Sequence, residues 1–264
     1  MLKINNVYKT FNPGTINEKR ALNGLNLHLK EGDFVTVIGG NGAGKSTMLN
    51  AVAGTWPVDS GEIIIGGVNV TKLSEYKRAT YLGRVFQDPM TGTAATMGIE
   101  ENLALAKRRG KLRLLRTGIT RQERDEYREL LKTLGLGLEN RLTSKVGLLS
   151  GGQRQALTLL MATLQKPKLL LLDEHTAALD PKTAAKVLET TDMIVNRDHL
   201  TTMMITHNMK DAIAHGNRLI MMMEGHIILD IEGEEKKQLT VKDLLEKFEQ
   251  ASGEEFSNDS ALLN

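Results

Sequence analysis

The chain has 264 residues, and its 34 lysines and arginines nearly balance 32 aspartates and glutamates, which gives a formal net charge of +2. This charge argues neither for nor against a nucleic-acid partner, and the 41% hydrophobic content is ordinary for a globular protein of one large or two small domains. The absence of cysteine excludes disulfides and any cysteine-based metal site.

The N-terminal stretch MLKINNVYKTFNPGT lacks the apolar segment of a signal peptide. The densest apolar runs, residues 169–172 and 219–223, are far shorter than the roughly 20 residues that a membrane helix needs. We therefore expect that any work at a membrane goes through a partner.

Strands and helices alternate along the chain. Apolar patterns predict strands at residues 2–11, 25–38 around a turn, 62–70, 81–86, 168–174 and 201–207, and a hairpin over 219–230. Helices are expected at 45–52, 182–196 and 241–250, and a helical block at about 96–165 lies between two strands. This order favours an α/β core with a parallel sheet, and the polar tail from Ser252 is expected to fray.

A phosphate-binding loop follows the apolar strand FVTVIG and precedes a predicted helix. Residues 39–46, GGNGAGKS, match G-x-x-x-x-G-K-[ST], and this context argues against an accidental glycine-rich turn. Its backbone N–H groups and the helix dipole suit phosphate oxygens. Lys45 is expected to reach the β- and γ-phosphates, and the Ser46 hydroxyl to bind Mg²⁺. The predicted ATP-binding residues of this loop are Gly39, Asn41, Gly42, Ala43, Gly44, Lys45, Ser46 and Thr47.

Two carboxylates end the apolar strand KLLLLDE. An unpaired Asp173 at the end of a buried strand would be costly, and Mg²⁺, bound directly or through water, removes that cost. Glu174 follows at once and is well placed to orient or deprotonate an attacking water. Alone, Glu174 would be interpreted as a solvated strand-end charge, but its position beside Asp173 favours the catalytic role.

A second helix start with the features of an anion site lies far downstream, in LSGGQRQ at residues 149–155. Ser150 can cap the helix, and Gly151 and Gly152 let a phosphate approach the backbone. This segment resembles the signature of the ATP-binding cassette (ABC) ATPases without departure. Gln87 in VFQDP resembles the family's Q-loop, residues 178–181 its D-loop, and His207 its switch histidine.

The resemblance spans roughly residues 2–230 and implies a fold. That fold is an α/β P-loop NTPase core with a mainly parallel sheet, an N-terminal antiparallel β subdomain and an inserted α-helical subdomain. It predicts an ATPase domain over residues 1–240, with the helical subdomain near 96–165. A C-terminal helix and flexible tail would follow over 241–264.

The resemblance also implies why one chain carries two phosphate sites. In the family, two copies pack head to tail, and each ATP lies between the phosphate loop of one copy and the Ser-Gly-Gly-Gln of the other. Ser150, Gly151, Gly152 and Gln153 are thus expected to contact the partner copy's nucleotide, and Asp180 the dimer interface. ATP would favour the closed dimer, and hydrolysis would let it open.

The family assigns the remaining roles. Ser46, Gln87 and Asp173 are expected to surround Mg²⁺ and its waters, Glu174 to act on the attacking water, and His207 to contact the γ-phosphate. Each has a plainer alternative: by themselves, Gln87 would be a polar loop residue and His207 a strand-end histidine with a structural partner.

Three positions either have a competing candidate or depart from the pattern of the family. Phe11 lies where the family stacks an aromatic ring on adenine, and Tyr8 competes for that role, since an aromatic near a strand end is usually core. His175 stands where the family usually has proline, and Asn208 where aspartate is frequent. We expect both to be subfamily marks, with a structural role for His175 preferred over a catalytic one.

The helical block is where the family docks its membrane partner. The block contains a basic stretch, formed by Lys107, Arg108, Arg109, Lys111, Arg113 and Arg116. It is interpreted either as a solvated surface or as a contact with a permease or anionic lipid headgroups. No aromatic residues interleave these charges, so no nucleic acid is expected.

The function implied is the ATP-hydrolysing subunit of an importer at the cytoplasmic face of the cell membrane. Its partners would be a second copy, a separate permease and, indirectly, an extracytoplasmic lipoprotein-type solute-binding protein. The solute would be small, such as an amino acid, with tryptophan as one example. The alternatives are an exporter ATPase, a non-transport ABC ATPase in translation or chromosome maintenance, and a non-enzymatic nucleotide-binding module, against which Glu174 and His207 count.

Overall fold

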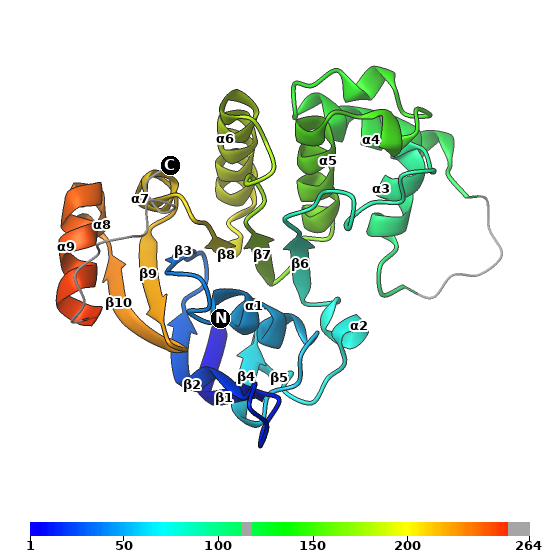
Figure 1. Ribbon diagram of the computed structural model, residues 1–264. Helices are drawn as coiled ribbons and strands as arrows, with labels where there is room; N and C mark the ends of the chain where they lie inside the picture. The colour runs from blue at the N-terminus through cyan, green and yellow to red at the C-terminus, as the bar shows by residue number, and fades with distance from the viewer. Residues whose placement is uncertain (112–117, 253–264) are drawn as a thin grey trace.

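The computed structural model describes residues 1–111 and 118–252, and its strands form two sheets (Figure 1). The smaller sheet is antiparallel, with the order β2-β1-β4-β5. Its strands are β1 (Leu2–Phe11), β2 (Lys19–Leu29), β4 (Ser60–Ile65) and β5 (Val68–Asn69). The larger sheet has the order β10-β9-β3-β8-β7-β6 and is parallel except for β10. Its strands are β3 (Phe34–Ile38), β6 (Leu82–Val85), β7 (Leu169–Asp173), β8 (Thr201–Ile205), β9 (Arg218–Met223) and β10 (His226–Glu232).

Helix α1 (Lys45–Ala53) contributes to the hydrophobic core that joins the two sheets. The leucines of β7 show how the larger sheet is buried on both faces. Leu169 and Leu171 point into this first core, whereas Leu170 and Leu172 belong to a second core on the opposite face. A continuous apolar strand is therefore required here, because neither face meets water.

The second core lies between the larger sheet and the helices of the other face. It includes residues of α5 (Gly151–Thr163) and α6 (Pro181–Asp198), and of the helices α3 (Ile99–Lys107) and α4 (Arg121–Lys132). Two short 3-10 helices, η1 (Leu138–Asn140) and η2 (Val146–Leu148), complete the helical block, which Figure 1 shows at the β6 end of the sheet. The predicted α/β class, with an antiparallel N-terminal sheet and an inserted helical block, is confirmed.

A third core covers the β9–β10 end of the sheet. It is formed by residues of β9 and β10 with α7 (Met209–Ala214) and α9 (Val241–Ser252), and α8 (Glu234–Gln238) lies between them in sequence. In the part of the chain that the structure describes, no helix combines the length and apolar character needed to cross a membrane. The expected frayed tail beyond Ser252, and Arg113 and Arg116 of the basic stretch, lie outside the described residues.

The structure corrects several element boundaries. Strand β2 begins at Lys19 rather than near residue 25, because pairing with β1 extends the strand through a polar stretch without apolar alternation. Residues 62–70 form two strands, since Gly66 and Gly67 make a turn with φ of 57° and 82°. The short helices α2 (Glu75–Arg78), α7 and α8 were not predicted, because segments of four to six residues carry too little periodicity.

Candidate functional site

The phosphate loop connects β3 to α1, and two of its glycines are required by close packing as well as by backbone angle. Gly39 has φ of 146°, and a Cβ there would lie 2.2 Å from the Met222 carbonyl oxygen. Gly44, with φ of 104°, precedes α1, and its Cβ would lie 2.5 Å from the Ala21 carbonyl oxygen. Only glycine fits these positions, so the loop is fixed between β2 and β9 with its helix start intact.

Lys45 is buried at the first position of α1. Its Nζ donates hydrogen bonds to the carbonyl oxygens of Gly39, at 2.7 Å, and Gly40, at 3.1 Å. Burial lowers the pKa of Lys45, and the nearby Glu174 carboxylate acts in the opposite direction. A buried cation whose partners in this chain are carbonyl oxygens is suited to an anion with more negative charge, such as a phosphate.

A pocket of about 280 Å³ opens over this loop. It brings together residues that lie up to 196 positions apart, from Phe11 to His207. The lining residues are Phe11, Lys19, Ala21, Asn41, Gly42, Ala43, Gly44, Lys45, Ser46, Thr47, Glu174 and His207. Lys19 was not predicted: it is the first residue of β2, and no motif marks it.

Glu174 and His207 form a close pair beside the loop. Parallel pairing of β7 with β8 brings the ends of the two strands together, and the Glu174 Oε1 lies 2.5 Å from the His207 Nε2. The Glu174 N–H donates to the Ile205 carbonyl oxygen at 3.1 Å. Glu174 has φ of 46°, a left-handed conformation that non-glycine residues rarely adopt, and such strain concentrates at functional sites.

Asp173 faces Arg84 from the neighbouring strand β6. An Arg84 terminal nitrogen donates to the Asp173 Oδ2 at 3.3 Å and to the Asn50 Oδ1 at 2.8 Å. The Asn50 side chain in turn donates to the Ser46 carbonyl oxygen at 2.8 Å. Burial raises the pKa of Asp173, and Arg84 opposes that shift. Sequence reasoning missed Arg84, although a charged residue within the predicted strand YLGRVF was the signal.

The two candidates for the adenine contact differ in position. The Phe11 ring lines the pocket and meets Trp56 edge to face, with centroids 5.0 Å apart and an interplanar angle of 82°. The Tyr8 hydroxyl instead lies against Gly24, where it would be 2.9 Å from an added Cβ. Of the two, Phe11 is the ring that lies at the pocket.

The second anion-type helix start has a complete capping box. The Ser150 hydroxyl accepts from the Gln153 N–H at 3.3 Å, and the Gln153 side chain accepts from the Ser150 N–H at 3.2 Å. A Cβ on Gly152 would lie 2.1 Å from the Thr183 Cγ2, so packing against α6 already requires glycine there. Residues 150–153, all of them described, are not among those that line the phosphate-loop pocket.

Gln87 and Asp180 also lie outside that pocket. Gln87 is exposed just after β6. Asp180 caps α6 by accepting the Thr183 N–H at 3.1 Å, and hydrogen bonds from Thr183 lower the pKa of its carboxyl. Asp180 thus has a structural role within this chain.

The two departures from the resembling pattern both have structural partners. The His175 ring is 2% exposed, and its Nε2 lies 3.1 Å from the Thr191 Oγ1 of α6. Burial lowers the pKa of His175 to about 4, and the His215 charge adds to the shift. Asn208 caps α7 by accepting the N–H groups of Lys210 and Asp211 at 2.8 and 3.2 Å.

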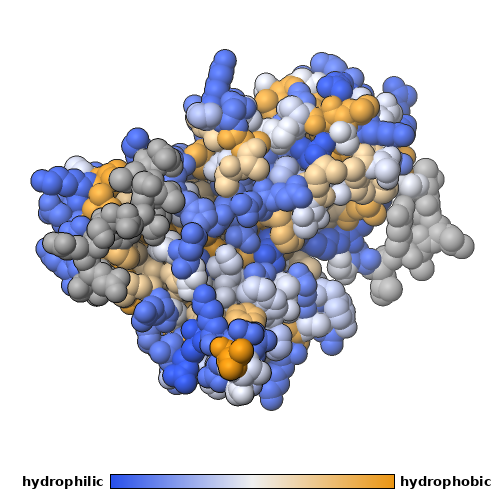
Figure 2. Space-filling model, in the orientation of Figure 1, coloured by the Kyte–Doolittle hydropathy of each residue, from blue (hydrophilic) through white to orange (hydrophobic). Residues whose placement is uncertain are grey.

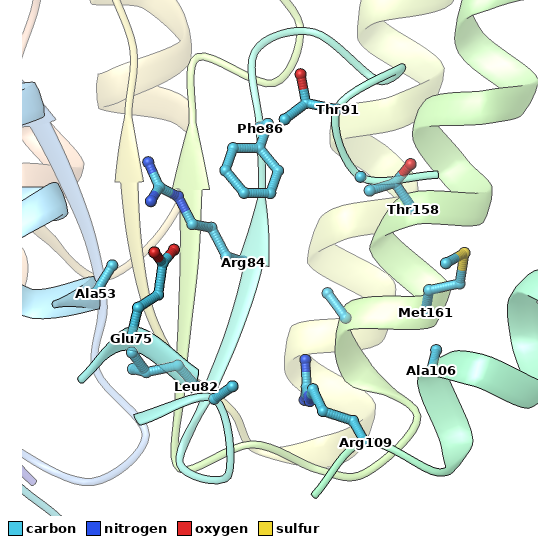
Figure 3. Close-up of a pocket in the computed structure, with 13 residues that line it drawn as sticks. Ala53, Glu75, Leu82, Arg84, Phe86, Thr91, Ala106, Arg109, Thr158 and Met161 are labelled. Carbon is cyan, nitrogen blue, oxygen red and sulfur yellow. The ribbon is translucent and has the colours of Figure 1, made fainter. Parts of the chain in front are cut away.

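A second hollow of about 320 Å³, called here the groove, lies between one end of the sheet and the helical block (Figure 3). Arg84 and Phe86 on or next to β6 form its floor, and Thr158 and Met161 of α5 form one wall. The remaining lining residues are Ala53, Glu75, Ala79, Leu82, Thr91, Gly92, Ala106, Arg109 and Ala162. Figure 2 shows apolar surface over the helical block, where Leu105 and Leu148 are large exposed apolar residues.

Most basic side chains in the described part of the basic stretch have partners or lie in the groove. Lys107 pairs with Glu126, and Arg108 with Glu123 at 2.8 Å. Arg109 lines the groove, and burial lowers its pKa. Lys111 is exposed. In the basic stretch, two side chains therefore form ion pairs with α4, one lines the groove and one faces the solvent.

The oxygen donors near the phosphate loop fit one kind of metal. In residues 1–111 and 118–252, no cluster of three or more histidine, aspartate or glutamate side chains is suited to hold a metal ion. The pocket over the loop instead offers the Ser46 and Thr47 hydroxyls and the Glu174 carboxylate, and Asp173, at the end of β7 and outside the pocket lining, is connected to the Ser46 carbonyl oxygen through Arg84 and Asn50. Such a sparse set suits Mg²⁺, which keeps most of its waters and takes further oxygens from a substrate phosphate.

Comparison with known proteins gives a consistent result. The family model described as ABC transporter matches residues 22–177. The tyrosine transport ATP-binding protein of Clostridioides difficile is 47% identical over 252 residues, which cover 95% of this chain and 100% of that protein. The methionine import ATP-binding protein of Bartonella henselae is 34% identical and covers 86% of this chain, which spans 64% of that longer protein.

Solved structures agree with the sequence matches. A dimeric bacterial ABC transporter cassette superposes with a TM-score of 0.74 at 31% identity, covering 88% of this chain and 98% of the other. The same values hold for a dimeric post-hydrolysis cassette bound to ADP and phosphate. The ADP conformation of another cassette gives a TM-score of 0.75 at 25% identity, covering 94% of this chain and 98% of the other.

Proposed function

This chain belongs to the ABC transporter family and is an ATP hydrolase of that family, and from that premise we propose that it energises import of an amino acid through a separate permease. The proposal places it at the cytoplasmic face of the cell membrane. The full-length relative at 47% identity that is named for tyrosine transport supports an amino acid, and an aromatic one in particular, as solute.

The observation that carries the chemistry is the Glu174–His207 pair beside the phosphate loop. Glu174 is the strand-end carboxylate that takes the proton of the attacking water, or orients that water toward the γ-phosphate. His207, 2.5 Å away, fixes the direction of the carboxylate and contacts the γ-phosphate. Lys45 and the loop amides of residues 39–47 bind the phosphates, and Phe11 stacks on adenine.

We propose that Mg²⁺ binds beside the phosphate loop. Ser46 and Asp173 would hold it with Gln87 at its waters, and it neutralises charge on the β- and γ-phosphates when bound. The chain's own contribution is to hold the Ser46 backbone beside the end of β7 through Asn50, which contacts both the Ser46 carbonyl oxygen and the Arg84 guanidinium.

The signature residues are proposed to act on the nucleotide of a second copy. Ser150, Gly151, Gly152 and Gln153 start α5 away from this chain's own pocket, with their helix N-terminus available to an anion. Asp180 would contact the partner copy. Two of the structural relatives are dimeric cassettes, which supports a dimer for this chain.

The groove is the proposed docking site of the permease. It is mostly apolar, it lies between sheet and helical block, and its Phe86 immediately precedes Gln87. A permease segment in the groove would therefore contact the chain one residue from a proposed magnesium-site residue. A solute-binding protein outside the membrane completes the proposed system without touching this chain.

Purification from the native cell tests the transport proposal. The tagged chain is extracted in detergent, its partners are identified by mass spectrometry, and the complex is placed in liposomes with labelled tyrosine, tryptophan or methionine. We expect one multi-span permease, and ATP-dependent movement of an aromatic amino acid that Glu174→Gln abolishes. A ribosomal or DNA-bound eluate without a permease would contradict transport, and solute movement in the opposite direction would contradict import.

A further inference from the structure

Arg84 touches both the groove and the proposed magnesium site. Its guanidinium lies over the Phe86 ring, 4.5 Å from the centroid, on the groove floor. The other end of the same group pairs with Asp173 at 3.3 Å and with Asn50 at 2.8 Å. Figure 3 shows the side chain extending from β6 between Phe86 and Glu75. One side chain thus spans the distance between two regions to which different functions are proposed.

The hydrogen-bonding capacity of Arg84 is not filled within the chain. Its Nε is buried and, among the described residues, has no hydrogen-bond partner. A second groove residue, Arg109, has a buried Nε in the same condition. Buried unpaired donors are costly, and both would be satisfied by an acceptor on whatever fills the groove.

Arg84 also competes with any cation for Asp173. The Arg84 and Asp173 side chains are only 14% and 17% exposed. A guanidinium and a divalent ion that share one carboxylate repel each other strongly at such a poorly hydrated position. Pairing with Arg84 therefore lowers the affinity of this edge of the sheet for a metal, and turning Arg84 away raises it.

We propose that Arg84 is a positioning residue that reports occupancy of the groove to Asp173. With the groove empty, Arg84 pairs with Asp173 and weakens metal binding. An acceptor on the docked permease segment draws the guanidinium toward the groove and frees the carboxylate for Mg²⁺. This inference rests on the proposed function, because the permease and the magnesium role of Asp173 belong to it.

The test measures metal affinity rather than turnover. Binding of Mn²⁺, used in place of Mg²⁺, to the isolated chain with a non-hydrolysable ATP analogue is followed by electron paramagnetic resonance. Arg84→Met should raise the Mn²⁺ affinity by about fivefold or more, because a neighbouring cation is removed. Arg84→Lys keeps the charge and should remain near the wild type. Arg109→Met is the matched control: it lies in the same groove without contacting Asp173, and should leave the affinity unchanged.

The same titration on the detergent-purified permease complex tests the link to the groove. The wild-type complex should bind Mn²⁺ more tightly than the isolated wild-type chain, and Arg84→Met should remove that difference. An unchanged or lower affinity in isolated Arg84→Met, or a difference that persists in its complex, overturns the proposal. Absence of nucleotide-dependent Mn²⁺ binding in the wild type would instead overturn the magnesium assignment within the proposed function. Thermal melting shows whether each variant is folded.

Discussion

At the scale of single residues, Glu174 is positioned by its backbone and its neighbours. Its left-handed φ of 46° is compensated by the hydrogen bond to Ile205 and by the packing of the next residue, His175, against α6. The Thr191 hydroxyl donates to the Val187 carbonyl oxygen at 2.9 Å, so it accepts from His175, whose Nε2 carries the proton. Burial lowers the pKa of His175 to about 4, so the ring is neutral at pH 7 and forms part of the structure next to Glu174.

His175 should make stability depend on pH in a narrow range. Its pKa is about 4 in the folded protein and 6.5 in the unfolded chain. Above pH 6.5 both states are neutral and the contribution to stability is fully present. As the pH falls from 6.5 to 4, the unfolded chain alone takes up a proton, so up to about 3 kcal/mol of stability is lost.

The variant His175→Gln keeps a donor for Thr191 but does not titrate. Urea denaturation at about pH 7.5 and pH 5 should show the wild type losing about 2 kcal/mol more than the variant. Comparing the two proteins cancels the other titrating groups. If wild type and variant lost the same free energy of unfolding between the two pH values, the His175 ring would not be held neutral by burial, and the assignment would be wrong.

At the scale of elements, the end of α1 depends on a buried arginine. Arg78 is 2% exposed, and its guanidinium donates to the carbonyl oxygens of Ala51 and Val52 at 2.6 and 2.9 Å. It also donates to Leu73 and Thr71, both at 2.9 Å. A positive charge at the C-terminus of the helix that follows the phosphate loop stabilises that helix.

Arg78→Met should destabilise the fold by about 3 kcal/mol, because four carbonyl oxygens lose their donor and a buried site loses its charge–dipole partner. The free energy of unfolding from urea titration measures the effect. The neighbouring Lys77 is exposed, so Lys77→Met is the matched control and should change stability by less than about 0.5 kcal/mol. Similar losses in both variants would contradict a capping role for Arg78.

Arg78 also shows which parts of the molecule can be predicted from sequence. Long apolar strands such as residues 168–174 and the phosphate loop are predictable, since their patterns are local. Arg78, in the polar stretch LSEYKRAT, has no local signal, because the two acceptors that give it its capping role, Ala51 and Val52, lie in a helix that ends 25 residues earlier in the sequence. Arg84 and Lys19 were missed for the same reason: their roles depend on strand order and on a hairpin, which spacing does not specify.

At the scale of the whole molecule, one of the two phosphate-type helix starts borders the phosphate-loop pocket and the other does not. The pocket of this chain includes the phosphate loop, Glu174 and His207, and excludes residues 150–153. The head-to-tail dimer therefore remains a prediction about two copies, and it is tested on the intact chain.

Glu174→Gln should form a stable dimer in the presence of ATP and Mg²⁺, because binding is retained while hydrolysis, which opens the dimer, is lost. Size-exclusion chromatography with light scattering measures the mass. The double variant with Lys45→Ala is the control and should stay monomeric, since it lacks the cation that binds the phosphates. Monomer alone for Glu174→Gln with ATP would contradict the sandwich.

The second core joins the helical block to the larger sheet, because both contribute side chains to it. Leu103 and Tyr127 of the block share that core with Val85, Leu170 and Leu172 of the sheet. A segment exchange between relatives therefore has to carry the facing sheet residues along with the block. Natural recombination faces the same constraint, so if the groove docks a permease as proposed, a change of permease is expected to arise by substitutions at the groove rather than by exchange of the whole block.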